Sequence, residues 1–481
     1  MNLKQKTISG LTWSFIDNFA KLSITFIVGI ILARLLEPRE FGLVGMTTIF
    51  IAVSQSFIDS GFTQALIRKK DCTQTDYSTV FFFNLATGIF FYFILFFSAG
   101  LISTFFDEPK LTLIVKFLAL GLIINAFTIV QRARLTKEIN FKLQTKISII
   151  ATTASGIIGI WMAYNGYGVW SLVIRTLAGF AFTSLLLWIW NNWNPSLVFS
   201  KKSFEEMFSF GSKLLVSGLI NTTYINIYLL IIGKYFSATE LGYYSRADQF
   251  KNLPSQNIAS VIQRVSYPVL SSIQDDKPQL KIAYRKLIRS TMLITFVLML
   301  FLAAIAKPFV LTLIGEKWLP SVIYLQLLCF VGMFYPLHAL NLDMLQVQGR
   351  SDLFLKLEVI KKILAVPAII IGIYYGIKIM IIGMLFNTLI AYYLNSYWSG
   401  KFIGYSFIQQ IKDILPSFIF ASLISIIVFV IGNLLDISNL WKLIIQISVG
   451  VLLFIGIAET SKMNDYLYIK HIFFEKLKKR N

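Results

Sequence analysis

Long apolar runs, separated by short polar segments, recur along the whole chain of 481 residues. Within each run the apolar residues are continuous, which indicates helices, because the strands of a membrane barrel alternate apolar and polar positions. About 20 apolar residues cross a bilayer as a helix, and only helices and closed barrels satisfy the backbone polar groups in lipid. The pattern therefore predicts an all-α integral membrane protein.

The pattern fits fourteen membrane spans. Their approximate limits are residues 8–34, 41–61, 77–103, 111–131, 145–164, 168–191, 207–233, 240–270, 286–307, 320–347, 354–375, 378–399, 413–434 and 439–460. The eighth span differs from the rest because Arg246, Lys251 and Arg264 interrupt it. Its place in the membrane therefore needs separate support.

The distribution of basic residues supplies that support and predicts the orientation. With the N-terminus inside, the predicted cytoplasmic segments hold thirty Lys and Arg residues, whereas the opposite loops hold eight. Cytoplasmic loops of membrane proteins are enriched in these residues. Without a span at 240–270, every later loop changes sides and the bias collapses in the C-terminal half. We therefore predict fourteen transmembrane helices with both termini in the cytoplasm, and we expect the polar residues of the eighth helix to face protein or water.

A short internal match predicts a duplication. The segment ARLLEPREFGLVGM resembles GKYFSATELGYYSR, and its EFG tripeptide at 40–42 recurs as ELG at 240–242, two hundred residues later. Six spans separate the copies, so both halves have the same orientation and form a parallel repeat with its axis along the membrane normal. The predicted regions are a six-helix N-lobe at 1–200, a six-helix C-lobe at 201–400, and two further helices with a basic tail at 401–481.

Composition narrows the function classes. The chain is 56% hydrophobic and 14% charged, whereas a soluble domain carries about 25% charged residues. The cytoplasmic loops explain the net charge of +20, so we expect no nucleic acid partner. Cys72 and Cys329 provide no disulfide framework or metal motif, and we expect no cofactor and no metal site. The first apolar segment lacks a cleavage site of small residues and is interpreted as a retained helix.

The eighth span carries a polar stripe. On a helical wheel one face holds Arg246, Gln249, Leu253, Gln256 or Asn257, Ser260 and Arg264. A charge at the bilayer centre costs about 3 kcal/mol on insertion scales. These side chains therefore either line a hydrated cavity or pair within the helix bundle, and the residues alone leave both interpretations open.

Further polar residues concentrate in the first, second, seventh and eighth spans, which suggests a cavity lined by the first two helices of each half. Arginine is well suited to phosphate, and amides and tyrosines suit sugar hydroxyl groups. The candidate substrate-binding residues are Arg246, Gln249, Lys251, Asn257, Arg264, Lys21, Arg175, Asn221 and Tyr224. The candidates for coupling to an ion, with H⁺ and Na⁺ both open, are Asp17, Asp59, His338 and Asp343.

Three segments closely resemble the Wzx-type polysaccharide flippases of the multidrug/oligosaccharidyl-lipid/polysaccharide exporter superfamily. They are SGFTQALIRKKD, GYYSRADQFKNLPSQNIASVIQRVSYPVLSSIQDD and QGRSDLFLKLE. The resemblance implies a fourteen-helix fold with two six-helix lobes. It also implies a flippase of the bacterial inner membrane, which moves an oligosaccharide on an undecaprenyl pyrophosphate carrier from the cytoplasmic to the periplasmic leaflet by ion-coupled alternating access. The implied partners are this lipid-linked oligosaccharide, a coupling ion, anionic inner-leaflet lipids, a polysaccharide polymerase and a chain-length regulator.

The lipid II flippases of the same superfamily are less similar. They line their cavity with arginines in spans 1, 2 and 8. Here the eighth span keeps Arg246, the first offers only Lys21, and the second has no basic residue. This difference argues against lipid II itself as the substrate.

Two other function classes fit the sequence less well. A drug or cation antiporter of the same superfamily should have a more acidic and aromatic cavity, whereas basic residues in these spans match or outnumber acidic ones. A membrane-embedded polysaccharide polymerase or glycosyltransferase needs an extramembrane site, but the outer loops have about ten residues or fewer and carry no catalytic motif. We therefore predict a transporter and not an enzyme.

Overall fold

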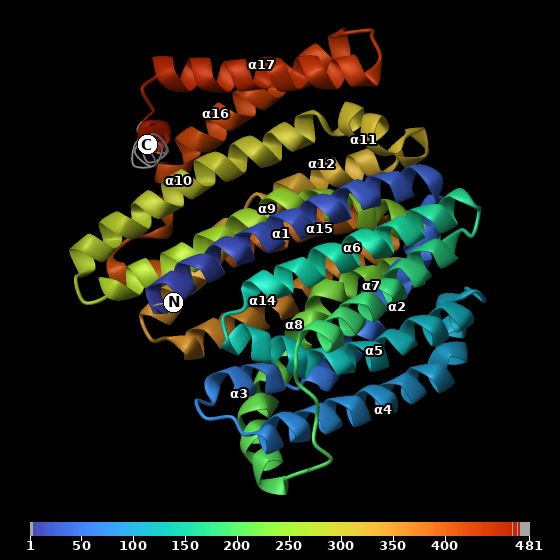
Figure 1. Cartoon of the computed structure of the whole chain (residues 1–481). Coiled ribbons are helices and arrows are strands. Elements are labelled where there is room, and N and C mark those ends of the chain that lie inside the picture. The colour runs from blue at the N-terminus through green and yellow to red at the C-terminus, as the bar shows by residue number, and fades with distance from the viewer. Residues whose placement is uncertain (1–2, 464, 469, 472–481) are drawn as a thin grey trace. The chain divides into compact units, whose positions relative to one another are not determined.

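The computed structural model describes residues 3–463, 465–468 and 470–471 of the chain, and this part is built from helices without a strand (Figure 1). It forms two compact units, the N-terminal unit (Met1–Gly242) and the C-terminal unit (Tyr243–Asn481). The all-α membrane architecture predicted from the apolar pattern is confirmed.

The helices of the N-terminal unit run from the first described residues to the linker before α9. Their bounds are α1 (Leu3–Leu35), α2 (Pro38–Asp59), α3 (Phe62–Arg68), α4 (Gln74–Phe106), α5 (Leu111–Lys137), α6 (Phe141–Tyr164), α7 (Val169–Trp190) and α8 (Lys201–Tyr235). The next helix starts in this unit and lies mostly in the C-terminal unit. The remaining bounds are α9 (Ala238–Ser272), α10 (Lys277–Ala304), α11 (Ala306–Ile314), a 3₁₀ turn (Glu316–Trp318), α12 (Ser321–Gly332), α13 (Tyr335–Val347), α14 (Ser351–Tyr375), α15 (Ile377–Ile403), α16 (Phe407–Leu434) and α17 (Asn439–Thr460).

Twelve helical segments of the described part are long and apolar enough to cross a membrane. Two of them combine neighbouring helices, α2 with α3 and α12 with α13. With 35 and 25 residues, α9 and α14 are long enough, but neither is among these twelve segments, because α9 is too polar and α14 is too highly charged. The count of fourteen spans and the cytoplasmic position of both termini therefore stay predictions.

Local sequence signals explain where several helices begin. At the start of α2, Pro38 occupies the first turn and the Glu37 backbone N–H donates to Glu40 Oε2 at 2.9 Å. At the start of α4, the backbone N–H of Thr73 donates to Asp76 Oδ2 at 2.9 Å while the Asp76 backbone N–H donates to Thr73 Oγ1 at 3.2 Å. Such reciprocal bonds satisfy backbone groups that a helix start leaves unpaired.

The predicted duplication is visible in the helix boundaries. α1 ends at Leu35 and α8 at Tyr235, and the following helices begin at Pro38 and Ala238. Gly42 lies so close to the backbone carbonyl of Ala238 that a Cβ there would overlap it, and Gly242 lies equally close to the carbonyl of Pro38. The contact is reciprocal at the offset found in the sequence. The repeat axis along the membrane normal stays a prediction.

The repeat extends beyond the segment in which it can be read from the sequence. After α5 the Asn140 backbone N–H donates to the Leu135 carbonyl at 2.8 Å, and after α13 the Arg350 backbone N–H donates to the Leu345 carbonyl at 2.8 Å. The two turns lie two hundred and ten residues apart and end their helices in the same way. An insertion of ten residues therefore separates this pair from the first.

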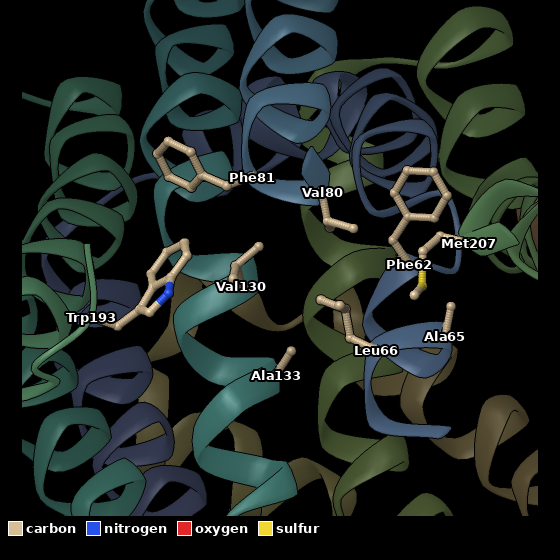
Figure 2. Packing of buried hydrophobic residues seen from close by; sticks show 9 residues of the cluster. All are labelled: Phe62, Ala65, Leu66, Val80, Phe81, Val130, Ala133, Trp193 and Met207. Atoms are coloured by element: carbon tan, nitrogen blue, oxygen red, sulfur yellow. The ribbon is translucent and has the colours of Figure 1, made fainter. Parts of the chain in front are cut away.

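Packing in the N-terminal unit centres on pairs of adjacent helices, with α4 on α5, α6 on α1 and α7, and α8 on α2. One apolar core joins α3, α4, α5, α8 and the segment after α7 (Figure 2). Its buried members are Phe62, Ala65, Leu66, Val80, Phe81, Val130, Ala133, Trp193 and Met207. In the C-terminal unit α16 packs on α10 and α17, and α14 packs on α15. The domain limits at 200 and 400 describe duplicated sequence rather than packing, and they stay a prediction.

Candidate functional site

The polar stripe of α9 forms an exposed face for most of its length. Its exposed members are Gln249, Gln256, Asn257, Ser260 and Arg264. The buried members of the helix include Ala247, Phe250, Ala259, Ser266 and Leu270. A long helix in a membrane protein that exposes amides, a hydroxyl and a guanidinium needs water or polar ligand against that face.

Arg246 and Lys251 differ from the exposed members of this stripe. Only 5% of Arg246 is exposed; its Nη1 donates to Gln249 Oε1 at 2.6 Å, and its guanidinium lies 5.6 Å from the centre of the Trp318 ring. The Lys251 ammonium pairs with Asp248 at 2.7 Å, and its stem packs against Gly332. Both basic groups are therefore held by neighbours, while Gln249 is the exposed end of the Arg246 pair.

The other candidate substrate-binding residues lie in the N-terminal unit. Arg175 on α7 is half-buried and packs against Gly159 of α6, where a Cβ would come within 2.9 Å of the Arg175 Cβ. On α8, Asn221 is exposed and Tyr224 is half-buried. Lys21 on α1 is exposed and lines a polar cavity. The structure thus gathers the predicted residues into several places rather than one.

The polar cavity has a volume of about 120 Å³. It lies among α1, α5, α6 and α7, and its lining residues are Asp17, Lys21, Arg132, Gln144, Ile147, Ser148, Thr183 and Leu187. The i,i+4 spacing of Asp17 and Lys21 would allow them to pair on one helical face, but no ion pair joins them among the described residues. Asp17 acts electrostatically on Arg132, which lines the same cavity.

The four ion-coupling candidates have different surroundings. Asp59 Oδ1 accepts from the backbone N–H of Thr63 at 3.2 Å and from its hydroxyl at 2.6 Å, so Asp59 joins α2 to α3. His338 Nδ1 lies 3.3 Å from the Asn395 amide nitrogen. Asp17, described above, faces the polar cavity. These contacts give Asp59 a clear structural role.

Asp343 is the most deeply placed of the four, with 5% exposure. Its Oδ2 accepts from the Ser266 hydroxyl at 2.8 Å and its Oδ1 from the Gln263 amide at 3.2 Å. Both donors lie on α9 and both are neutral. A carboxylate bonded only to neutral groups within a bundle can exchange a proton without breaking an ion pair.

Two polar groups of consequence were not among the candidate site residues. Arg132 was assigned to a cytoplasmic segment; it lies near the end of α5, which continues to Lys137, and it lines the polar cavity. Asn341 of α13 is fully buried, accepts from the Ser399 hydroxyl at 2.6 Å and contacts the Gln410 amide nitrogen at 3.3 Å. The sequence signal for Asn341 was its position as a polar residue inside an apolar run, two residues before Asp343.

No group of three or more His, Cys, Asp and Glu side chains that could hold a metal ion occurs in the described ranges. The candidate site is therefore a set of arginine, amide, hydroxyl and carboxylate groups, which act by hydrogen bonding and charge. Such groups can bind phosphate and sugar hydroxyls and can carry a proton.

This chain is similar to known proteins in sequence. Lipopolysaccharide biosynthesis protein WzxC of Escherichia coli (strain K12) is 28% identical over 402 residues, which cover 82% of this chain and 80% of that protein. Teichuronic acid biosynthesis protein TuaB of Bacillus subtilis (strain 168) is 26% identical over 357 residues, which cover 73% of each chain. These relatives confirm the resemblance that the three sequence segments carry.

The chain is also similar to a solved structure. Lipid II flippase MurJ in an inward closed conformation matches 97% of this chain and 99% of its own, with a TM-score of 0.71 and 15% sequence identity. At that identity the likeness concerns the fold. The family model described as polysaccharide biosynthesis protein matches residues 31–323, more than half of the sequence. This chain therefore belongs to the polysaccharide biosynthesis protein family.

Proposed function

We propose that this protein is a flippase of the bacterial inner membrane, which carries lipid-linked oligosaccharide units from the cytoplasmic to the outer leaflet by alternating access. The family and the names of its relatives support a role in supplying polysaccharide, and the MurJ-like fold supports a transporter rather than an enzyme. The undecaprenyl pyrophosphate carrier is the substrate class that the sequence resemblance implies.

The exposed polar face of α9 is the observation that carries this proposal. The lipid tail of such a substrate can stay in the bilayer, but its pyrophosphate and sugars must leave water and cross a region of low dielectric constant. Arg264 offers a guanidinium whose paired N–H groups match phosphate oxygens. The amides of Gln249, Gln256 and Asn257 offer donors and acceptors that match sugar hydroxyl groups.

Asp343 is the residue that we assign to proton coupling. When ionised, it accepts hydrogen bonds from Ser266 and Gln263 and holds the second half of α9 against α13. A proton on Asp343 removes one acceptor and weakens that connection. The position of the exposed α9 face would then depend on whether Asp343 is protonated. Ion-coupled alternating access needs such a link between ion binding and conformation.

The α9 face also bears on the rival antiporter function. Its exposed charged member is Arg264, and the nearest acid on the helix, Asp248, is half-buried and paired with Lys251. An organic cation would meet the Arg264 guanidinium there, whereas Asp343, which contacts Gln263 and Ser266 beside it, is buried. The charge pattern therefore favours an anionic substrate.

The test replaces Arg264 in the full-length protein and measures the leaflet distribution of lipid-linked oligosaccharide in cells that lack the native gene. Without the protein, the lipid-linked unit should accumulate on the cytoplasmic side. Arg264→Gln should lower flipping about tenfold or more, because it removes a charged donor to phosphate, and Arg264→Lys should keep part of it. Lys412→Gln, which removes an exposed basic residue from α16, is the matched control and should transport normally.

Two results would contradict the proposal. Unchanged leaflet distribution after deletion of the gene would exclude the flippase function itself. Full transport by Arg264→Gln at normal protein level would exclude the α9 face as the phosphate path. Arg246→Gln provides a contrast within the same helix, because the buried Arg246 is expected to affect the amount of folded protein as well as transport.

A further inference from the structure

The polar cavity of the N-terminal unit has a chemistry distinct from that of the α9 face. Its charged members are one acid, Asp17, and two bases, Lys21 and Arg132. We propose that this cavity binds a phosphate group that carries one proton, either inorganic phosphate or the head of a phosphate monoester. Only the lipid form of that ligand rests on the proposed function; binding of phosphate does not.

The separation of the charges is the first argument. No ion pair joins Asp17, Lys21 and Arg132 among the described residues, although all three line one small cavity. Lys21 and Arg132 reach solvent at the edge of the cavity, and Asp17 is half-buried. The Asp17 Oδ1 atom is also buried without a hydrogen-bond partner. A polar occupant that contacts both signs of charge would satisfy all three groups.

The size of the cavity limits that occupant. Its volume of about 120 Å³ is well above the ~10–15 Å³ that one water needs on the same measure, so it has room for a tetrahedral anion. It is below the roughly 300 Å³ of the smaller ligand pockets, so it suits a small ligand better than a sugar chain.

The sign of the lining favours an anion. Lys21 and Arg132 are donors only, and charge-assisted bonds from such groups to phosphate oxygens are among the stronger protein hydrogen bonds. They outnumber the acid by two to one. Both are exposed at the edge of the cavity, which leaves it open to an entering ligand.

The acceptors of the lining select the protonated form. The Gln144 amide nitrogen donates one of its two N–H groups to Thr136 Oγ1 at 3.0 Å, and the Thr183 hydroxyl donates to the Gly179 carbonyl at 2.7 Å, which leaves one Gln144 N–H and the Ser148 hydroxyl as further neutral donors. Their remaining oxygen lone pairs, like the Asp17 carboxylate, accept hydrogen bonds and do not donate them. A monoprotonated phosphate brings a P–OH group that can donate to Asp17. Sulfate has the same shape but carries no proton, so it would meet Asp17 with repulsion.

The position in the fold fits an intracellular phosphate. Arg132 lies in the last two turns of α5, Gln144 lies in the first turn of α6, and Leu187 lies in the last turn of α7. In the predicted orientation these ends are cytoplasmic. Inorganic phosphate from the cytoplasm and the head of a lipid monophosphate in the inner leaflet both reach that level.

The test measures binding to the full-length protein in a maltoside detergent, which contributes no phosphate. Thermal unfolding and calorimetric titration are run with inorganic phosphate, with sulfate and with a short polyprenyl monophosphate at about pH 6.5, near the second pKa of phosphate monoesters, ~6. Phosphate should bind and raise the unfolding temperature, and sulfate should bind about tenfold or more weakly. If the polyprenyl monophosphate displaces phosphate, the ligand is lipid-borne, and if it does not, the ligand is free phosphate.

Variants test the assigned roles. Arg132→Gln should weaken phosphate binding about tenfold or more, and Arg132→Lys should recover part of that loss. Asp17→Asn removes the acceptor charge, so phosphate and sulfate should then bind within about threefold of each other. Lys146→Gln removes a basic residue from α6 that does not line the cavity, and it should bind phosphate like the parent. The unfolding temperature without ligand shows that each variant is folded.

Three outcomes would overturn the proposal. They are no phosphate-dependent change in the parent protein, equal binding of phosphate and sulfate by the parent, and unchanged phosphate binding by a folded Arg132→Gln protein. Because these measurements need no transport, they can fail while flipping is intact, and they can succeed in a protein that does not flip.

Discussion

The turn after α5 in the N-terminal unit and the turn after α13 in the C-terminal unit share their backbone hydrogen bonds but differ in the residue at the left-handed position. That residue is Ile139, with φ of 58°, in the first turn and Gly349, with φ of 68°, in the second. Glycine adopts this conformation freely, whereas a β-branched residue meets steric strain there. The half-buried Ile139 side chain packs against Gly10 of α1, which compensates for that strain. The repeat thus preserves backbone geometry, and each unit supports it with its own contacts.

A buried amide occupies equivalent places in the two units. Gln131 of α5 donates to the Trp193 carbonyl at 3.0 Å and accepts from the Asn191 amide at 2.5 Å. Asn341 of α13 lies two hundred and ten residues later and contacts side chains of α15 and α16 instead. In the N-terminal unit the amide fixes the linker after α7. In the C-terminal unit it joins α15, which belongs to the repeat, to α16, which lies outside it.

Ion pairs follow the same division. In the N-terminal unit Lys69 donates to Asp76 at 3.0 Å and to Glu206 at 2.9 Å. Burial lowers the pKa of Lys69, but its hydrogen bonds to Glu206 and Asp76 outweigh that effect and hold the pKa above its ordinary value. In the C-terminal unit Arg285 of α10 makes two bonds of 2.5 Å to Asp413 of α16. Lys69 thus ties the loop after α3 to α4 and α8. The Arg285–Asp413 pair ties α16, which lies outside the repeat, to α10.

The largest expected effect concerns the reciprocal glycines at the starts of α2 and α9. Gly42→Val and Gly242→Val each place side-chain atoms where a backbone carbonyl already lies, so neither can be accommodated by a rotamer change. Each should destabilise the protein by about 3 kcal/mol or more. Detergent size-exclusion profiles and unfolding temperatures would show loss of folded protein for both.

Gly100→Ala is the matched control, because Gly100 lies within α4 with open space around it. It should be neutral or slightly stabilising, since alanine favours a helix over glycine by up to about 1 kcal/mol. If one of the valine variants folded normally while the other did not, the two glycines would not be equivalent. In a reciprocal contact, a side chain added at either glycine should disrupt the packing.

The apolar pattern predicted most of the fold, and charge asymmetry predicted α9, but tertiary contacts decided the rest. The apolar pattern did not predict the short helices α3 and α11 or the break between α12 and α13. The helix that contains the fourth predicted span, 111–131, continues to Lys137, so it carries Arg132 on its last turns. A helical wheel placed Arg246 on the polar stripe and left open whether it faces a cavity or pairs within the bundle, because the wheel does not show that Trp318 and Gln249 lie beside the guanidinium.

An intermediate effect is expected at the ion pairs. Arg285→Ala leaves the Asp413 side chain, which is 8% exposed, with the Tyr405 hydroxyl at 2.7 Å as its remaining partner. A loss of about 1–3 kcal/mol is expected, because a buried charge loses its counter-charge. Lys69→Ala should cost less, about 0.5–1 kcal/mol, since Asp76 keeps its bonds to Thr73. Unfolding temperatures of the two purified variants give the order, and a larger loss for Lys69→Ala would reverse the comparison.

The smallest effect, and the one that sharpens the comparison most, is expected at the two left-handed positions. Gly349→Ala adds a Cβ at a φ of 68° with open space around it, so the loss comes from backbone strain alone and should be about 1 kcal/mol. Ile139→Gly removes a strain of about 1–2 kcal/mol but also removes the contact with Gly10 and makes the unfolded chain more flexible. We therefore expect a change of less than about 1 kcal/mol for Ile139→Gly, against a clear loss for Gly349→Ala. Unfolding temperatures measured side by side test this, with Gly166→Ala, at another left-handed glycine in open space, as the control for strain. A clear loss of stability in Ile139→Gly would mean that the packing of the Ile139 side chain outweighs its backbone strain. The turn of the N-terminal unit would then require a side chain at this position, whereas the turn of the C-terminal unit requires glycine.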